Sequence, residues 1–367
     1  MGFNKGEWTE AYTFIKLLGE GQVFAADENL NKIDEKAYTI FKIFQENIKR
    51  YYEIDSKNQK INIVDFEGNL IDSKDSIDFV KKADESLGDI IKGKGRSFEV
   101  PILEEFLNDI GIYNLKSAAD KKEDIKMEIL DLKLDNPKTL NFSVKSFLGE
   151  DPTLFNASRD NTNFLFKIEG LSEDEMKSIN SIKSRIERIG EIFRQYKNNN
   201  YRVEFIDEKD KILYQNLRLI DSSLPKILAV MVFYFFSHKG INSVSDLTDI
   251  LIQNNPLNLE DSEKGNFYNK KISEFLEAVA FGMVPATKWD GNNEINGGFL
   301  SVLKDGEILC HHLYYDNISL KNYLMNHTRF DYPAGSPKKH DYGFIFNENG
   351  EFFLKLNLQV RFDSKEL

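Results

Sequence analysis

Residues 122–146, KEDIKMEILDLKLDNPKTLNFSVKS, decide how the first part of the chain folds. Within this stretch, Asp135–Lys138 (DNPK) favours a turn, because proline presets one backbone dihedral and Asp or Asn tolerates the others. Apolar and polar residues alternate on both sides of the turn, as they do on half-buried strands. The segment therefore predicts a β-hairpin. The alternating apolar positions are Ile125, Met127 and Ile129 before the turn, and Leu140, Phe142 and Val144 after it.

The predicted hairpin carries an acid at its start and a lysine at its end. Asp124 precedes the first strand, and Lys145 lies near the end of the second. Ser143 faces the same side as Lys145, because side chains alternate with a period of two. Hydrolysis of a phosphodiester needs hard cations that activate water, and Mg²⁺ requires only one or two protein carboxylates. The arrangement is typical of a metal-dependent nuclease, with Asp124 as a metal ligand and Lys145 stabilising the phosphate and orienting water.

Two other acids on the hairpin compete with Asp124 as metal ligands. Glu128 shares the face of Asp124 and could bind the metal or form a salt bridge within the hairpin. Asp131 lies near the turn and would project far from Lys145. The spacing alone is a weak signal, since many solvent-exposed hairpins have an acid followed by polar-x-Lys.

A second source of carboxylates is the N-terminal segment. Residues 7–18 predict an amphipathic helix whose apolar face includes Trp8 and Phe14. Glu7 and Glu10 are three residues apart and share a face. Glu7 also suits a solvated first turn, where the helix dipole favours acids. Glu10 is the second candidate metal ligand.

The rest of the chain predicts an α/β (α+β) protein with a mixed central sheet flanked by helices. Residues 33–54 predict a further helix, because apolar residues recur there every three or four positions. Three regions are expected: a nuclease core over 1–170, a helical and partly basic insertion over 171–285, and a β-rich C-terminal part over 286–367 that recognises DNA. The other predicted elements are strands 61–64 and 164–168, helices 74–92, 101–110, 172–199, 223–237, 244–253 and 267–282, and strands 299–303, 308–314, 342–346 and 352–362.

Two basic segments are candidates for phosphate contacts. Lys92–Arg96 (KGKGR) lacks the Gly-Lys-Ser/Thr ending of a P-loop and follows no strand, so we expect a flexible connection there. Residues 177–202 contain seven Lys or Arg against two Glu. This stretch could contact a nucleic-acid backbone or form an ordinary solvated helix face.

Composition sets further bounds on the class of protein. The net charge of −12 argues against a protein that coats nucleic acid, but not against an enzyme with a local basic surface. A single cysteine, Cys310, excludes an intramolecular disulfide and fits a reducing cytosol. No N-terminal signal is visible, and the longest apolar run, 227–236, is too short for a membrane span. We expect a bacterial cytoplasmic protein that does not contact a membrane.

Several uncommon motifs are spread along essentially the whole chain. They are Asn4–Glu10 (NKGEWTE), Ala25–Leu30 (AADENL), Phe142–Gly149 (FSVKSFLG), Pro152–Ser158 (PTLFNAS) and Leu356–Phe362 (LNLQVRF). Together they resemble the HpaII family of type II restriction endonucleases.

The resemblance implies a PD-(D/E)XK restriction-endonuclease-like core, dependence on Mg²⁺ and cleavage of double-stranded DNA at 5′-CCGG. Ser143 stands where this superfamily usually has an acid before the lysine. A metal ligand must then come from elsewhere, and Glu10 is the expected source. The implied roles are Asp124 as principal ligand, Glu10 as auxiliary ligand, Lys145 as the group that positions water and Ser143 as their support.

Two loops contain the candidate DNA-contacting residues. G·C pairs are read in the major groove by Arg or Lys donating to guanine and by acceptors facing cytosine. Sequence does not separate base contacts from phosphate contacts. The adjacent His311 and His312 are not expected to form a metal pair, because neighbours on a strand point to opposite faces. The candidates are Asn156, Ser158, Arg159 and Asn163 in one loop, and Arg329, Lys338, Lys339 and His340 in the other.

Alternatives to a site-specific endonuclease stay open. Ser143 would also suit an inactive DNA-binding protein on the same fold, and a modification-dependent nuclease is a third possibility. The expected partners are double-stranded DNA and a cognate DNA methyltransferase with which no stable complex forms. A palindromic site favours a homodimer, although monomers can cut one strand after the other.

Overall fold

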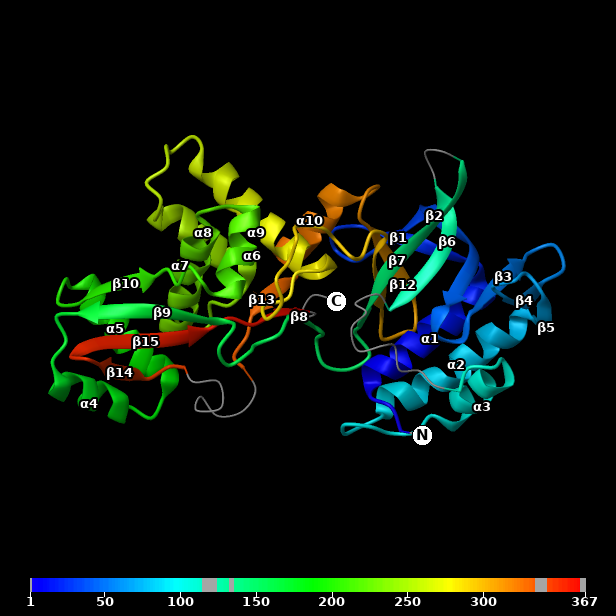
Figure 1. Ribbon diagram of the computed structural model, residues 1–367, viewed down its shortest axis with the longest axis horizontal. Helices are drawn as coiled ribbons and strands as arrows, with labels where there is room; N and C mark the ends of the chain where they lie inside the picture. Colours follow the sequence, from blue (N-terminus) through cyan, green and yellow to red (C-terminus); the bar gives the residue numbers. More distant parts are fainter. Residues whose placement is uncertain (1, 114–123, 132–134, 334–341, 364–367) are drawn as a thin grey trace. The chain divides into compact units, whose positions relative to one another are not determined.

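The computed structural model describes residues 2–113, 124–131, 135–333 and 342–363 (Figure 1). The chain forms two compact units, which are described separately. The first comprises 1–152 and 293–323, and the second comprises 153–292 and 324–366. Each unit is therefore built from two stretches that are distant in sequence.

A mixed sheet of nine strands forms the centre of the first unit (Figure 1). β12 runs parallel to β1, and β11 runs parallel to β7, whereas the other neighbours are antiparallel. β2 also pairs with β1. This confirms the predicted α+β class with a mixed sheet. The strands, in the order in which they lie side by side, are β1 (Gln22–Ala26), β12 (Ile308–His312), β11 (Gly298–Val302), β7 (Asn136–Ser146), β6 (Ile125–Asp131), β2 (Lys32–Gln45), β3 (Arg50–Asp55), β4 (Lys60–Asp65) and β5 (Leu70–Asp75).

The predicted hairpin is confirmed as β6 and β7. Their antiparallel register places Ile125 opposite Phe142 and Asp131 opposite Asn136. β7 begins at Asn136, inside the predicted turn, and Asp135 adopts a positive φ of 50°. The rest of the connection, 132–134, lies outside the described residues.

Three helices pack with this sheet into one apolar core. They include the predicted N-terminal helix, on which Trp8 and Phe14 are buried. Asn4 caps this helix, and the Glu7 carboxylate accepts a hydrogen bond from the Asn4 N–H at 2.7 Å. Glu7 is thus occupied by a capping box, as its first-turn position suggests. The helices are α1 (Lys5–Glu20), α2 (Ser76–Lys92) and α3 (Pro101–Asp109), and α10 (Asn317–Asn326) crosses the division between the units.

The predicted helix over 33–54 is wrong. These residues form β2 and β3, joined by the short 3₁₀ helix η1 (Glu46–Ile48). Tyr38 and Ile40 alternate on the buried side of β2. Aromatic and β-branched residues are frequent here and favour a strand, and the helical spacing was a coincidence of a locally apolar segment.

The second unit combines two smaller sheets with six helices among the described residues (Figure 1). One sheet has the order β10 (Arg202–Ile206), β9 (Asn163–Glu169), β15 (Glu351–Asn357) and β14 (Ile345–Glu348). The other has the order β13 (Thr328–Phe330), β16 (Val360–Phe362) and β8 (Thr153–Phe155). The helices are α4 (Glu173–Ser181), α5 (Arg185–Lys197), α6 (Ile212–Ile220), α7 (Leu224–Ser237), α8 (Val244–Asn254) and α9 (Lys264–Phe281).

The C-terminal β-rich segment contributes to both units. β11 and β12 pair within the nine-stranded sheet, whereas β13 to β16 belong to the second unit. No single helix in the described ranges is long and apolar enough to span a membrane. Helices α6 and α7 together have the required length and composition, but they are bent by 112° relative to each other.

Candidate active site

Three side chains of the β6–β7 hairpin form a continuous hydrogen-bonded chain. The Lys145 ammonium donates to the Ser143 hydroxyl oxygen at 2.8 Å. The Ser143 hydroxyl in turn donates to the Asp124 carboxylate at 3.0 Å. Ser143, the residue that departs from the acid-x-Lys pattern, therefore links the acid and the lysine of the site.

The backbone of the hairpin fixes the Asp124 carboxylate. The Asp124 N–H donates to the Phe142 carbonyl at 3.0 Å, which extends the ladder one residue beyond β6. The Val144 N–H donates to the same Asp124 oxygen as Ser143, at 2.6 Å. Two donors from β7 thus hold one carboxylate oxygen, and no hydrogen bond from the described residues engages the other.

Electrostatic interactions couple Glu10 of α1 to Asp124 and Lys145 of the hydrogen-bonded side chains. Burial, together with the negative charges of Asp124 and Glu7, raises the pKa of Glu10 to about 8, although Lys145 opposes this shift. Burial also raises the pKa of Asp124. The positive charge of Lys145 and the hydrogen bonds that Asp124 accepts from Val144 and Ser143 oppose this shift. The pKa of Lys145 is lowered by burial, although Asp124 and Glu10 oppose this shift. The structure brings all four predicted catalytic residues into one interacting cluster.

Thr9 and Ser146 are part of this region and were missed in the sequence. The Thr9 and Ser146 hydroxyls are hydrogen-bonded at 2.8 Å, and the Thr9 hydroxyl donates to the Lys5 carbonyl at 2.7 Å. Each is the immediate neighbour of a candidate catalytic residue, Glu10 or Lys145. The contact ties the first turns of α1 to the end of β7. A threonine on the apolar face of a helix was the signal that could have indicated it.

The donor set suits a hard divalent cation with two protein ligands. Asp124 and Glu10 repel each other, and a cation between them would relieve this repulsion. Mg²⁺ keeps several waters and needs one or two carboxylates, so the set fits its chemistry. No group of three or more His, Cys, Asp or Glu in the described residues could hold a metal. Glu128, the competing acid, forms a 3.9 Å ion pair with Lys42 of β2.

The raised pKa of Glu10 predicts how the metal-free protein responds to pH. The folded chain retains the Glu10 proton between its usual pKa of 4.5 and about 8, and unfolding releases it. The Glu10 contribution to the free energy of unfolding therefore falls as pH rises through this window. Asp124 acts in the same direction, and Lys145, with its lowered pKa, acts in the opposite one.

We expect Glu10→Gln to make this fall with pH shallower. Urea unfolding in the presence of a chelator, measured across the window, checks the slope. Glu67→Gln, which removes an exposed turn carboxylate, is the control for the loss of one carboxylate charge. An unchanged slope in Glu10→Gln would mean that Glu10 titrates normally in the folded chain.

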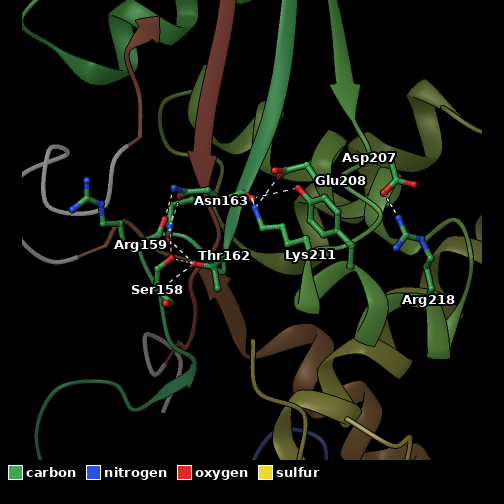
Figure 2. Close-up of polar contacts among 10 residues, drawn as sticks. Ser158, Arg159, Thr162, Asn163, Asp207, Glu208, Lys211 and Arg218 are labelled. Carbon is green, nitrogen blue, oxygen red and sulfur yellow. Dashed lines mark hydrogen bonds and ion pairs between the residues drawn. The ribbon is translucent and has the colours of Figure 1, made fainter. Parts of the chain in front are cut away.

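The first candidate DNA-contacting loop lies in the second unit. Asn156 and Arg159 are exposed, and Ser158 is partly buried. Asn163 is buried, and its side-chain amide donates to the Arg159 carbonyl (Figure 2). The structure therefore makes Asn163 a support of the loop, and leaves Asn156 and Arg159 accessible to a ligand.

The second candidate loop is described only in part. Arg329 of β13 lies 3.5 Å from Asp331 and 3.9 Å from Asp363, so its guanidinium is held between two carboxylates. The other candidates there, Lys338, Lys339 and His340, lie outside the described residues. His311 and His312 are buried, and their rings pack against Tyr323 and Tyr315.

The basic stretch 177–202 is not a uniform cationic surface. Arg188 is buried and donates to the Gly343 carbonyl at 2.6 Å. The Arg185 guanidinium lies 3.7 Å from the Tyr332 ring centre. These two cations therefore hold α5 against other parts of the second unit.

Comparisons with known proteins identify the family of this chain. A family model described as HpaII restriction endonuclease matches residues 4–362. The type II restriction enzyme HpaII of Haemophilus parainfluenzae is 38% identical to this chain over 361 residues, which cover 98% of each protein. No solved structure matches the chain.

These similarities define the class of protein as a type II restriction enzyme, and they confirm the predicted enzyme class, a hydrolase that acts on DNA. Within that class, the chain belongs to the HpaII restriction endonuclease family.

Proposed function

We propose that this enzyme hydrolyses double-stranded DNA at a short palindrome, 5′-CCGG, in a Mg²⁺-dependent reaction on a PD-(D/E)XK core. The observation that carries the proposal is the hydrogen-bonded chain from Lys145 through Ser143 to Asp124, with Glu10 coupled to it electrostatically. The named relative supports the class of reaction, and the resemblance supports the recognition sequence.

Each residue of the site has a distinct role in this proposal. Asp124 and Glu10 would hold the cation, which when bound polarises the scissile phosphate and activates a water molecule. Lys145 contacts a phosphate oxygen and the attacking water, and its positive charge stabilises the negative charge that develops in the transition state. Ser143 fixes the Lys145 ammonium and the Asp124 carboxylate relative to each other.

The lowered pKa of Lys145 makes a proton transfer to its side chain part of the proposed mechanism. A lysine that loses its proton more readily can accept a proton from water as well as stabilise charge. Lys145 lies beside two carboxylates that oppose this shift, so its protonation depends on their state.

The fragment pattern from DNA of known sequence tests the proposal. With Mg²⁺, we expect discrete fragments that end at CCGG, and no cleavage of a matched DNA in which every CCGG is changed. A chelator should abolish the cleavage. Binding to CCGG without cutting would favour the inactive DNA-binding alternative, and cleavage only of methylated DNA would favour a modification-dependent nuclease.

The proposed reaction implies partners. A cognate methyltransferase would modify the same sequence and protect the DNA of the bacterial cytoplasm in which both proteins act. A palindromic substrate presents two equivalent strands, so a homodimer could cut both at once. Sedimentation with and without a CCGG duplex would separate this state from a monomer that cuts the strands in turn.

A further inference from the structure

A buried polar network underlies the loop between β8 and β9. The Thr162 hydroxyl oxygen accepts from the Ser158 N–H at 2.8 Å and lies 2.9 Å from the Ser158 carbonyl. The Asn357 side-chain amide donates to the Ser158 carbonyl at 3.2 Å and to the Asn163 side-chain oxygen at 2.5 Å. Thr162 and Asn357 are at most 1% exposed. The network therefore clamps both ends of a short turn, 158–163 (Figure 2).

The end of the loop at Asn163, where β9 begins, is also held by a charged side chain. The Lys211 ammonium of the α6 entry donates to the Asn163 carbonyl and to Glu208 at 3.2 Å. The Tyr214 hydroxyl reaches the same carbonyl at 3.3 Å. Backbone groups of a surface loop are usually satisfied by water, so this number of buried partners indicates a loop with one fixed conformation.

The tip of the loop carries two exposed side chains of opposite charge. Arg159 and Asp160 are both exposed, although their neighbours Thr162 and Asn163 are buried. In the part of the chain that the structure describes, no hydrogen bond or ion pair engages the Arg159 guanidinium or the Asp160 carboxylate. Figure 2 shows the Arg159 side chain extending away from the network.

We propose that Arg159 and Asp160 read one G·C base pair in the major groove, and that Thr162 and Asn357 are positioning residues for this pair. The inference rests on the proposed function. Arginine donates to the O6 and N7 of guanine, and a carboxylate accepts from the N4 amino group of cytosine. A rigid loop presents both groups without the entropy loss of ordering a flexible one on binding.

The proposed role of Arg159 and Asp160 is tested by measuring how well the enzyme discriminates between DNA sequences. The ratio of kcat/KM for the cognate duplex to that for duplexes with one altered base pair is measured in the full-length enzyme. We expect Arg159→Ala and Asp160→Asn each to lower this ratio by roughly 10- to 100-fold at one position of the site. Arg218→Gln, which removes a cation ion-paired with Asp207 in the same unit, is the matched control and keeps the ratio.

The positioning role has its own readout. Thr162→Val removes the hydroxyl and is expected to lower the same ratio, chiefly through KM, while Thr162→Ser restores it. A Thr162→Val protein with an unchanged thermal unfolding temperature excludes general loss of folding as the cause.

The outcomes separate this inference from the proposed function. A wild-type enzyme that cuts no DNA would overturn the proposed function, and the inference with it. A wild-type enzyme that cuts, with Arg159 and Asp160 variants that keep full discrimination, would overturn the inference alone. Equal weakening on all sequences would show that Arg159 contacts phosphate and not a base.

Discussion

Lys145→Met is expected to lower kcat for DNA cleavage by roughly 100- to 1,000-fold, with little change in the affinity for specific DNA. Methionine keeps the length and apolar contacts of lysine but removes the ammonium that Ser143 orients. The stabilisation of the developing negative charge is lost, while surfaces that contact DNA elsewhere stay intact. Single-turnover cleavage and a binding assay without metal measure the two effects separately.

A second lysine on the same hairpin provides the control for this experiment. Lys126 of β6 forms a 2.6 Å ion pair with Glu46 and takes no part in the site. Lys126→Met should cleave within a few-fold of wild type. If Lys145→Met retained wild-type kcat, the assignment of Lys145 would be wrong and the hairpin would hold the site only structurally.

Local sequence patterns were sufficient for the hairpin but not for its surroundings. Ile125, Met127 and Ile129 alternate along β6 because these positions face the core, and all three side chains are buried in the structure. The strand β2 was missed because its 14 residues also satisfy a helical spacing. The insertion of β11 between β7 and β12 joins residues far apart in sequence, and no local pattern contains that information.

The sequence was sufficient to propose the residues of the candidate site, but not the contacts among them. Asp124, Ser143 and Lys145 share a hairpin, so strand geometry alone places them near one another. Glu10 lies on a separate helix, and its approach depends on how α1 packs against the sheet. The hydroxyl contact between Thr9 and Ser146 depends on the same packing and could not be read from either segment alone.

Asp124→Asn is expected to reduce cleavage by about 1,000-fold or more, because it removes the principal carboxylate that would bind the cation. Asparagine has nearly the same shape, and its side-chain oxygen can still accept from the Val144 N–H and the Ser143 hydroxyl. The loss would then reflect chemistry and not disruption of the hairpin. Metal binding, measured by calorimetry, should weaken in parallel with cleavage.

Glu128→Gln distinguishes this explanation from the competing ligand. Glu128 lies on the same strand and is paired with Lys42, so its change should leave cleavage within a few-fold of wild type. The reverse result, loss of cleavage in Glu128→Gln and retention in Asp124→Asn, would transfer the ligand role to Glu128.

Stability provides an independent measure of the same site. The pKa of Asp124 is raised by burial, so its ionised form destabilises the folded, metal-free protein above the usual pKa of an aspartate. Asparagine removes that charge, and the metal-free variant should unfold at a temperature equal to or higher than that of wild type. A loss of activity together with retained or increased stability is characteristic of a residue kept for function at a cost to the fold. A marked fall in unfolding temperature would instead show that Asp124 serves the hairpin itself.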